Sequence, residues 1–115
     1  MKKIANFLWI ALFICACEKE QIPAGCNVGE SAWSTNIKPI VAINCAVSGC
    51  HSASRGDGNN FDFTTYDGTK EGIGSFYDRI NRPVGDPLAM PPDQLLDPCD
   101  LYKLNVWILN GAPEN

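Results

Sequence analysis

Histidine and methionine are scarce in this chain of 115 residues, which contains one histidine and two methionines. A basic stripe is also lacking, because the nine lysines and arginines are scattered and the net charge is −4. Nucleic-acid binding depends on clustered positive charge, so it has no support in this sequence. The apolar run near the N-terminus is shorter than the roughly 20 residues that span a bilayer. No internal repeat is visible, and the length allows one domain at most.

The first residues have the layout of a secretory signal peptide. Lys2 and Lys3 precede an apolar run over residues 4–16, which is interrupted only by Asn6. The run ends with Ala16 before Cys17, which is similar to the lipobox of bacterial lipoproteins. We therefore expect a signal peptide over residues 1–16 and a lipid anchor on Cys17. The protein would be exported to the periplasmic side or the outer membrane; the alternative is an ordinary signal peptide.

Two cysteines and the single histidine form one motif, Cys45-Ala-Val-Ser-Gly-Cys50-His51. A cysteine pair followed at once by histidine is typical of the covalent attachment of a c-type haem. The two thiols add to the two vinyl groups of the porphyrin, and the adjacent imidazole binds the iron from one face. The spacer between the cysteines has four residues instead of the usual two. This spacer requires a bulged loop, which Ser48-Gly49 is expected to form.

A second axial ligand to the iron is predicted at Met90. Once the signal peptide is removed, Met90 is the only methionine left, and it lies among prolines in Leu88-Ala89-Met90-Pro91-Pro92. Thioether sulfur is a soft ligand, and a Met/His pair raises the potential of haem iron. The alternative for a single methionine is a side chain that fills a gap in the core.

Cys26 and Cys99 remain once haem attachment and lipidation are assigned. In an exported protein this pair is a candidate disulfide that joins the two ends of the domain. The alternative is two separate, partly buried thiols.

Three arginines are candidate contacts for the anionic haem propionates, because the guanidinium fork suits carboxylates. Arg55 lies close after the attachment motif, and Arg79 and Arg82 lie on the approach to Met90. For each of them an ordinary solvated surface position is the alternative.

The hydrophobic pattern predicts about three short helices joined by long loops. Apolar residues at helical spacing lead into the attachment motif, with Asn36 as the expected cap. A weaker pattern, which contains two glycines, covers residues 69–81. The last helix is the clearest, because Asp97 can cap it, Pro98 suits its first position and Gly111 can end it.

Together these segments resemble the small monohaem c-type cytochrome domains of exported bacterial lipoproteins. The resemblance covers nearly the whole mature chain and is carried by Ile37-Lys38-Pro39-Ile40, Cys45 to His51, Met90-Pro91-Pro92 and Trp107 to Pro113. It implies an all-α, cytochrome c-like fold over residues 31–115, wrapped around one covalent haem c, with the first and last helices crossing near the haem. Residues 17–30 would form a flexible tether.

The same resemblance assigns the site residues. It implies Cys45 and Cys50 as thioether attachments, His51 as the proximal iron ligand and Met90 as the distal one. Such cytochromes often orient the proximal imidazole through a proline carbonyl about a dozen residues further on. Here no proline occurs between His51 and Pro83, so this partner is not identified by the sequence.

The expected function is that of an electron carrier with no enzymatic activity, since a methionine ligand closes the iron to substrates. Its partners would be a redox protein at an exposed haem edge and the membrane that holds the lipid anchor. One alternative is a haem-free secreted binding module in which Cys45 pairs with Cys50 and Cys26 with Cys99. Another is a haem sensor or peroxidase with an open distal site.

Overall fold

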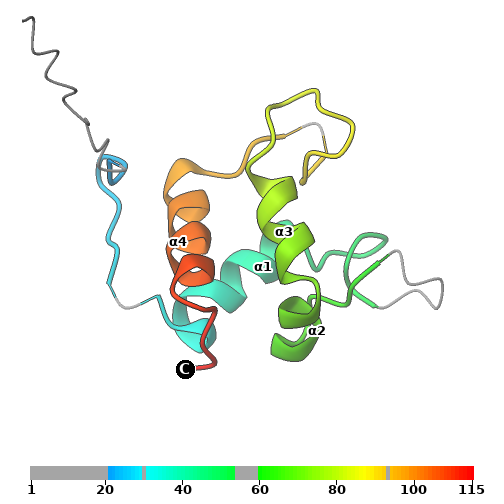
Figure 1. Cartoon of the computed structure of the whole chain (residues 1–115), viewed down its shortest axis with the longest axis horizontal. Coiled ribbons are helices and arrows are strands. Elements are labelled where there is room, and N and C mark those ends of the chain that lie inside the picture. The colour runs from blue at the N-terminus through cyan, green and yellow to red at the C-terminus, as the bar shows by residue number, and fades with distance from the viewer. Residues whose placement is uncertain (1–20, 30, 54–59, 93) are drawn as a thin grey trace, which may run out of the picture.

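The computed structural model describes residues 21–29, 31–53, 60–92 and 94–115. In these ranges the chain is helical and has no β-strand, so the predicted all-α class is confirmed (Figure 1). A π-helical turn continues into the first of four α-helices, with the bounds η1 (Trp33–Ile37), α1 (Lys38–Asn44), α2 (Tyr66–Glu71), α3 (Ile73–Ile80) and α4 (Pro98–Leu109). The last helix packs against η1 and α3, and α2 packs against α3. None of the described helices is long and apolar enough to cross a membrane.

The N-terminal helix begins earlier than predicted. Its cap is Ala32, whose carbonyl accepts hydrogen bonds from the amides of both Asn36 (3.0 Å) and Ile37 (3.1 Å). Asn36 is therefore not the cap; its side-chain oxygen accepts the amide of Ala32 at 3.3 Å. The wide π-helical turn lies just before Pro39, which has no amide hydrogen and would clash with the carbonyl four residues earlier in a regular α-helix.

The single helix predicted over residues 69–81 is two helices, which meet at Gly72. The first begins after Thr65, whose side-chain oxygen accepts the amide of Gly68 at 3.1 Å. A Cβ atom on Gly72 would lie 2.8 Å from the ring of Phe61 and 3.1 Å from that of Phe63. Glycine at this junction therefore lets both rings approach the backbone.

The C-terminal helix has the predicted bounds. The carboxylate of Asp97 accepts the amides of Cys99 (2.8 Å) and Asp100 (3.4 Å), and Pro98 occupies the first position. Gly111 then adopts a φ of +92°, a left-handed conformation that glycine takes without strain. Local chemistry alone accounts for both ends of this helix.

The core is centred on the contact between the first and last helices. Trp107 of α4 is fully buried and stacks on Trp33 of η1, with ring centroids 5.4 Å apart. The indole N–H of Trp107 donates to the carbonyl of Pro113 at 3.0 Å, and the hydroxyl of Tyr66 donates to that of Ala112 at 2.8 Å. The C-terminal segment therefore folds back over the core and ties α2 to the end of α4.

A disulfide joins Cys26 to Cys99 at the first turn of α4, with their Cα atoms 5.3 Å apart. The cross-link secures residue 26 to the helical domain. The predicted disulfide between these two cysteines is thus present in the structure. The predicted lipidation residue, Cys17, lies outside the described residues.

Candidate functional site

The attachment motif forms a closed loop directly after α1. The amide of His51 donates to the carbonyl of Cys45 at 3.1 Å and brings the two ends of the loop together. Inside the loop, the amide of Cys50 donates to the carbonyl of Val47 at 3.0 Å, and Gly49 has a φ of +81°. The four-residue spacer is thus taken up by a turn that depends on a left-handed glycine, at the position where a bulge was expected.

The two thiols of this loop have different surroundings. Cys45 is buried and Cys50 is exposed, and both are free thiols in the structure. Burial, with a smaller effect of the nearby Cys50, raises the pKa of Cys45 to about 12. The Cys45 thiol therefore keeps its proton at neutral pH. The Cys45–Cys50 disulfide of the haem-free alternative is not formed here.

The imidazole of His51 has a defined orientation. Its Nδ1 lies 2.9 Å from the carbonyl oxygen of Phe61. Because a carbonyl oxygen only accepts hydrogen bonds, Nδ1 must carry the proton, and in the neutral ring Nε2 then holds the lone pair that can bind a metal. The ring also stacks on Phe63, with centroids 4.3 Å apart and planes 18° from parallel.

The carbonyl of Phe61 fills the role that the sequence left without a residue. It accepts the hydrogen bond that orients the imidazole, and it comes from the segment after the loop. The amide of Phe63 donates to the carbonyl of His51 at 2.9 Å, so this segment runs alongside the histidine. Phe63 is buried and meets Phe76 of α3 edge to face, with centroids 5.2 Å apart.

Close packing against α2 holds this aromatic segment in place. A Cβ atom on Gly68 of α2 would overlap the carbonyl oxygen of Asp62, between the two phenylalanines. We therefore expect Gly68→Ala to lower the free energy of unfolding by about 2 kcal/mol, because the backbone of one element must shift. Denaturant unfolding of the full chain measures this change.

Gly74→Ala is the matched control, since a methyl group on this α3 glycine would meet no neighbouring group within 4 Å. It should leave the protein equally stable or about 0.5–1 kcal/mol more stable, because alanine favours the helix. Equal stability losses in the two variants would contradict the role given to close approach at Gly68.

The predicted distal ligand, Met90, lies in the connection between α3 and α4. It is half-buried, and its amide donates to the carbonyl of Arg79 at the end of α3 (3.0 Å). Met90 lines a cavity of about 190 Å³ whose walls are mixed: Ile80, Leu96 and Leu101 are apolar, whereas Arg82, Asp86 and Gln94 are polar. Met90 is therefore a half-buried residue beside a cavity and not a side chain that fills a gap in the closed core.

The described contacts form two separate groups of predicted site residues. Cys45, Cys50 and His51 share the attachment loop, and Met90 lies beside Arg82 in the lining of the cavity. His51 does not line that cavity. The structure thus places the two proposed axial ligands on different elements without a described contact between them.

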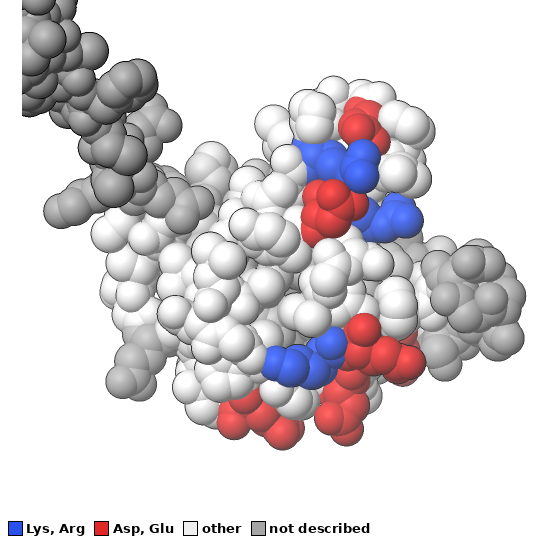
Figure 2. All heavy atoms as spheres, viewed as in Figure 1, with Lys and Arg blue, Asp and Glu red and all other residues white. Residues whose placement is uncertain are grey.

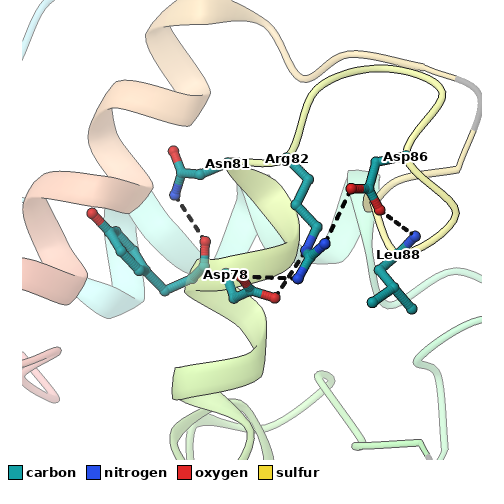
Figure 3. A network of polar contacts seen from close by, with 6 residues as sticks. Asp78, Asn81, Arg82, Asp86 and Leu88 are labelled. Carbon is teal, nitrogen blue, oxygen red and sulfur yellow. Dashed lines mark hydrogen bonds and ion pairs between the residues drawn. The ribbon is translucent and has the colours of Figure 1, made fainter.

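The structure describes two of the three arginines that were predicted to contact haem propionates. All three guanidinium nitrogens of Arg82 face carboxylates, those of Asp78 (3.0 and 3.3 Å) and Asp86 (3.1 Å), as Figure 3 shows. Arg82 is therefore part of a protein network of ion pairs, and its predicted contact with a haem propionate stays a prediction. Arg79 contributes its backbone carbonyl to Met90, and Arg55 lies outside the described residues.

Sequence reasoning did not predict the ion-pair network of Arg82 or the aromatic segment beside His51, and the sequence contains only weak signals for them. The spacing of Asp78, Arg82 and Asp86, four residues apart, favours ion pairs. Phe61 and Phe63 form a run too short to classify. On the face displayed in Figure 2, basic and acidic side chains lie next to one another, and no basic stripe appears there.

No family model, no curated protein and no solved structure matches the chain.

Proposed function

We propose that this protein is an electron carrier with one covalently attached haem c and with His51 and Met90 as the axial ligands. A single observation carries the proposal: one closed loop combines two free thiols with an imidazole whose Nδ1 is already bonded to the Phe61 carbonyl. A disulfide-stapled module has no need of this arrangement. An iron-binding histidine needs it, because it fixes the tautomer and the ring plane.

The residues of the loop fit the chemistry of haem attachment. Each S–H bond adds across one vinyl group, so that sulfur binds one carbon and hydrogen the other, and no oxidant is needed. The high pKa of Cys45 keeps its thiol protonated, and therefore uncharged, beside the apolar core. The exposed Cys50 is accessible to attachment enzymes.

Met90 supports a carrier over an enzyme. Its thioether can close the sixth position of the iron, which peroxidases and gas sensors keep open. When bound, the haem would supply one-electron exchange between Fe(II) and Fe(III). The protein would bind the haem and set its potential through the two axial ligands and the surroundings of the site.

Two further observations support the finer fold and the location. The Trp33–Trp107 contact between the first and last helices is the one expected of a cytochrome c-like fold. The Cys26–Cys99 disulfide suits an oxidising compartment, which agrees with export and with a lipid anchor on Cys17. A redox protein at an exposed haem edge is the proposed partner.

The test is a pyridine haemochrome spectrum combined with intact mass. The full chain, with its signal peptide, is produced in cells that attach haem to a reference cytochrome with a four-residue spacer. We expect the mature mass to include one haem and the spectrum to be that of a haem joined by two thioethers. The variant with Cys45→Ser and Cys50→Ser is the control and should carry no covalent haem. A wild-type mass without haem would refute the proposal, and a high-spin spectrum would favour the sensor or peroxidase.

A further inference from the structure

A network of charged side chains joins α3 to the loop that carries Met90 (Figure 3). Arg82 follows the end of α3. Its Nε and Nη2 donate to the two carboxylate oxygens of Asp78, one turn back on the helix, at 3.0 and 3.3 Å. Its Nη1 donates to Asp86 in the loop at 3.1 Å. One guanidinium thus connects a helical carboxylate to a loop carboxylate, and we call this group of three residues the Arg82 bridge.

The bridge continues through the backbone towards Met90. The second carboxylate oxygen of Asp86 accepts the amide of Leu88 at 2.8 Å, and the carbonyl of Asp86 accepts the amide of Ala89 at 3.0 Å. The next amide, that of Met90, donates to the carbonyl of Arg79. Three successive amides before and at the methionine are thereby fixed, two of them by Asp86.

The end of α3 is itself anchored, so the bridge has a rigid base. Asn81 and the buried Asn105 of α4 exchange two side-chain hydrogen bonds of 2.9 Å each. Asn81 also donates to the carbonyl of Tyr77. Movement of the Met90 loop therefore requires the loop to leave the helix, since α3 cannot follow it.

The charges of the bridge are partly shielded from water. The side chains of Arg82 and Asp86 are 30% and 25% exposed, against 57% for Asp78. An isolated surface ion pair contributes little to stability. Here the forked guanidinium of Arg82 forms ion pairs with two carboxylates, those of Asp78 and Asp86. Its loss would break both ion pairs and would also free the loop from α3. The amide of Leu88 and then Arg82 lower the pKa of Asp86, in agreement with an ionised carboxylate in this place.

We propose that Arg82 is a positioning residue for Met90: by bridging Asp78 and Asp86 it fixes the loop on α3 and so determines how often the thioether leaves the iron. The assignment of Met90 as an iron ligand rests on the proposed function, whereas the effect on the loop does not. Arg82 thus acts on the distal ligand through the backbone of the loop.

The experiment compares Arg82→Gln with Lys38→Gln in the purified full chain. The control removes one positive charge from an exposed side chain at the start of α1. Hydrogen exchange at the amides of Ala89 and Met90 should become roughly five- to ten-fold faster in Arg82→Gln. Exchange at Trp107 in the core should not change, and Lys38→Gln should match the wild type at all three positions.

A second readout uses the haem-bearing protein. Carbon monoxide should bind faster to Arg82→Gln by a similar factor, because it can enter only while Met90 is off the iron. Asp86→Asn should reproduce both effects, and adding it to Arg82→Gln should increase them little, since the two residues act as one unit. If Arg82→Gln does not fold, Asp86→Asn alone serves as the test.

The outcomes separate the two proposals. Unchanged hydrogen exchange at Ala89 and Met90 in both Arg82→Gln and Asp86→Asn would overturn the role of Arg82, whether or not haem is present. Faster exchange in a protein that carries no haem would support the control of the loop by Arg82 and refute the proposed function. Faster exchange with an unchanged rate of carbon monoxide binding would overturn the link between loop and ligand.

Discussion

We expect His51→Ala to abolish the folded, haem-bearing protein. His51 supplies the proposed proximal ligand, and its ring also bonds the Phe61 carbonyl and stacks on Phe63. Alanine removes all three interactions, and no other histidine is present in the chain to replace the ligand. The yield of protein with covalent haem, measured by intact mass and the haemochrome spectrum, should fall at least about ten-fold, the lower end of what is lost when only an orienting partner is removed.

The yield of His51→Ala is compared with that of Met90→Ala and with that of the wild type. Met90→Ala, made in the same cells, should keep covalent haem, because attachment needs only the cysteines and the proximal side. The wild type should show a low-spin spectrum with the sulfur–iron charge-transfer band. Normal amounts of His51→Ala with a wild-type spectrum would disprove the proximal assignment.

The second large effect is expected from Met90→Ala, which should open the iron on its distal side. Apart from Met1, Met90 is the only methionine in the sequence, so no other thioether near the site could complete the coordination. Its loss should convert the protein from low spin to high spin, allow carbon monoxide to bind readily and lower the reduction potential. Optical spectra with and without carbon monoxide, followed by a redox titration, measure all three changes.

Leu88→Ala is the matched control for this variant. It shortens an apolar side chain two residues away in the same loop, where Leu88 is 43% exposed, and it leaves the sulfur in place. Its spectrum should equal that of the wild type. If Met90→Ala kept the low-spin spectrum with its charge-transfer band, Met90 would not be the distal ligand, and the lining of the cavity would be its only role.

Predictions from the sequence succeeded where the cause is local. The C-terminal helix begins at Pro98 because Asp97 accepts the first free amides, and it ends before Gly111 because that residue takes a left-handed φ. The attachment motif is likewise contiguous, so its two thiols and imidazole are close together in any fold. Gly49, whose left-handed φ allows the turn that takes up the longer spacer, lies within the same motif.

Predictions failed where the cause is distant along the chain. The rings of Phe61 and Phe63 lie against Gly72, where one helix ends and the next begins, and a pattern within residues 69–81 does not contain them. The partner of His51 is a backbone carbonyl, and since every residue has one, no residue type could reveal it. Asn36 was expected to cap a helix that starts earlier, because the π-helical turn makes room for Pro39.

The chain by itself therefore determined the all-α class, the last helix and the closeness of two thiols and an imidazole in one loop, because each depends on neighbours a few positions apart. Tertiary structure decided which of their possible partners they meet. It turned Arg82 from an open cation into the bridge between Asp78 and Asp86, and it set the orientation of His51 through Phe61. The physical reason is that hydrogen bonds and ion pairs are short-ranged, so folding selects among the partners that the sequence only offers.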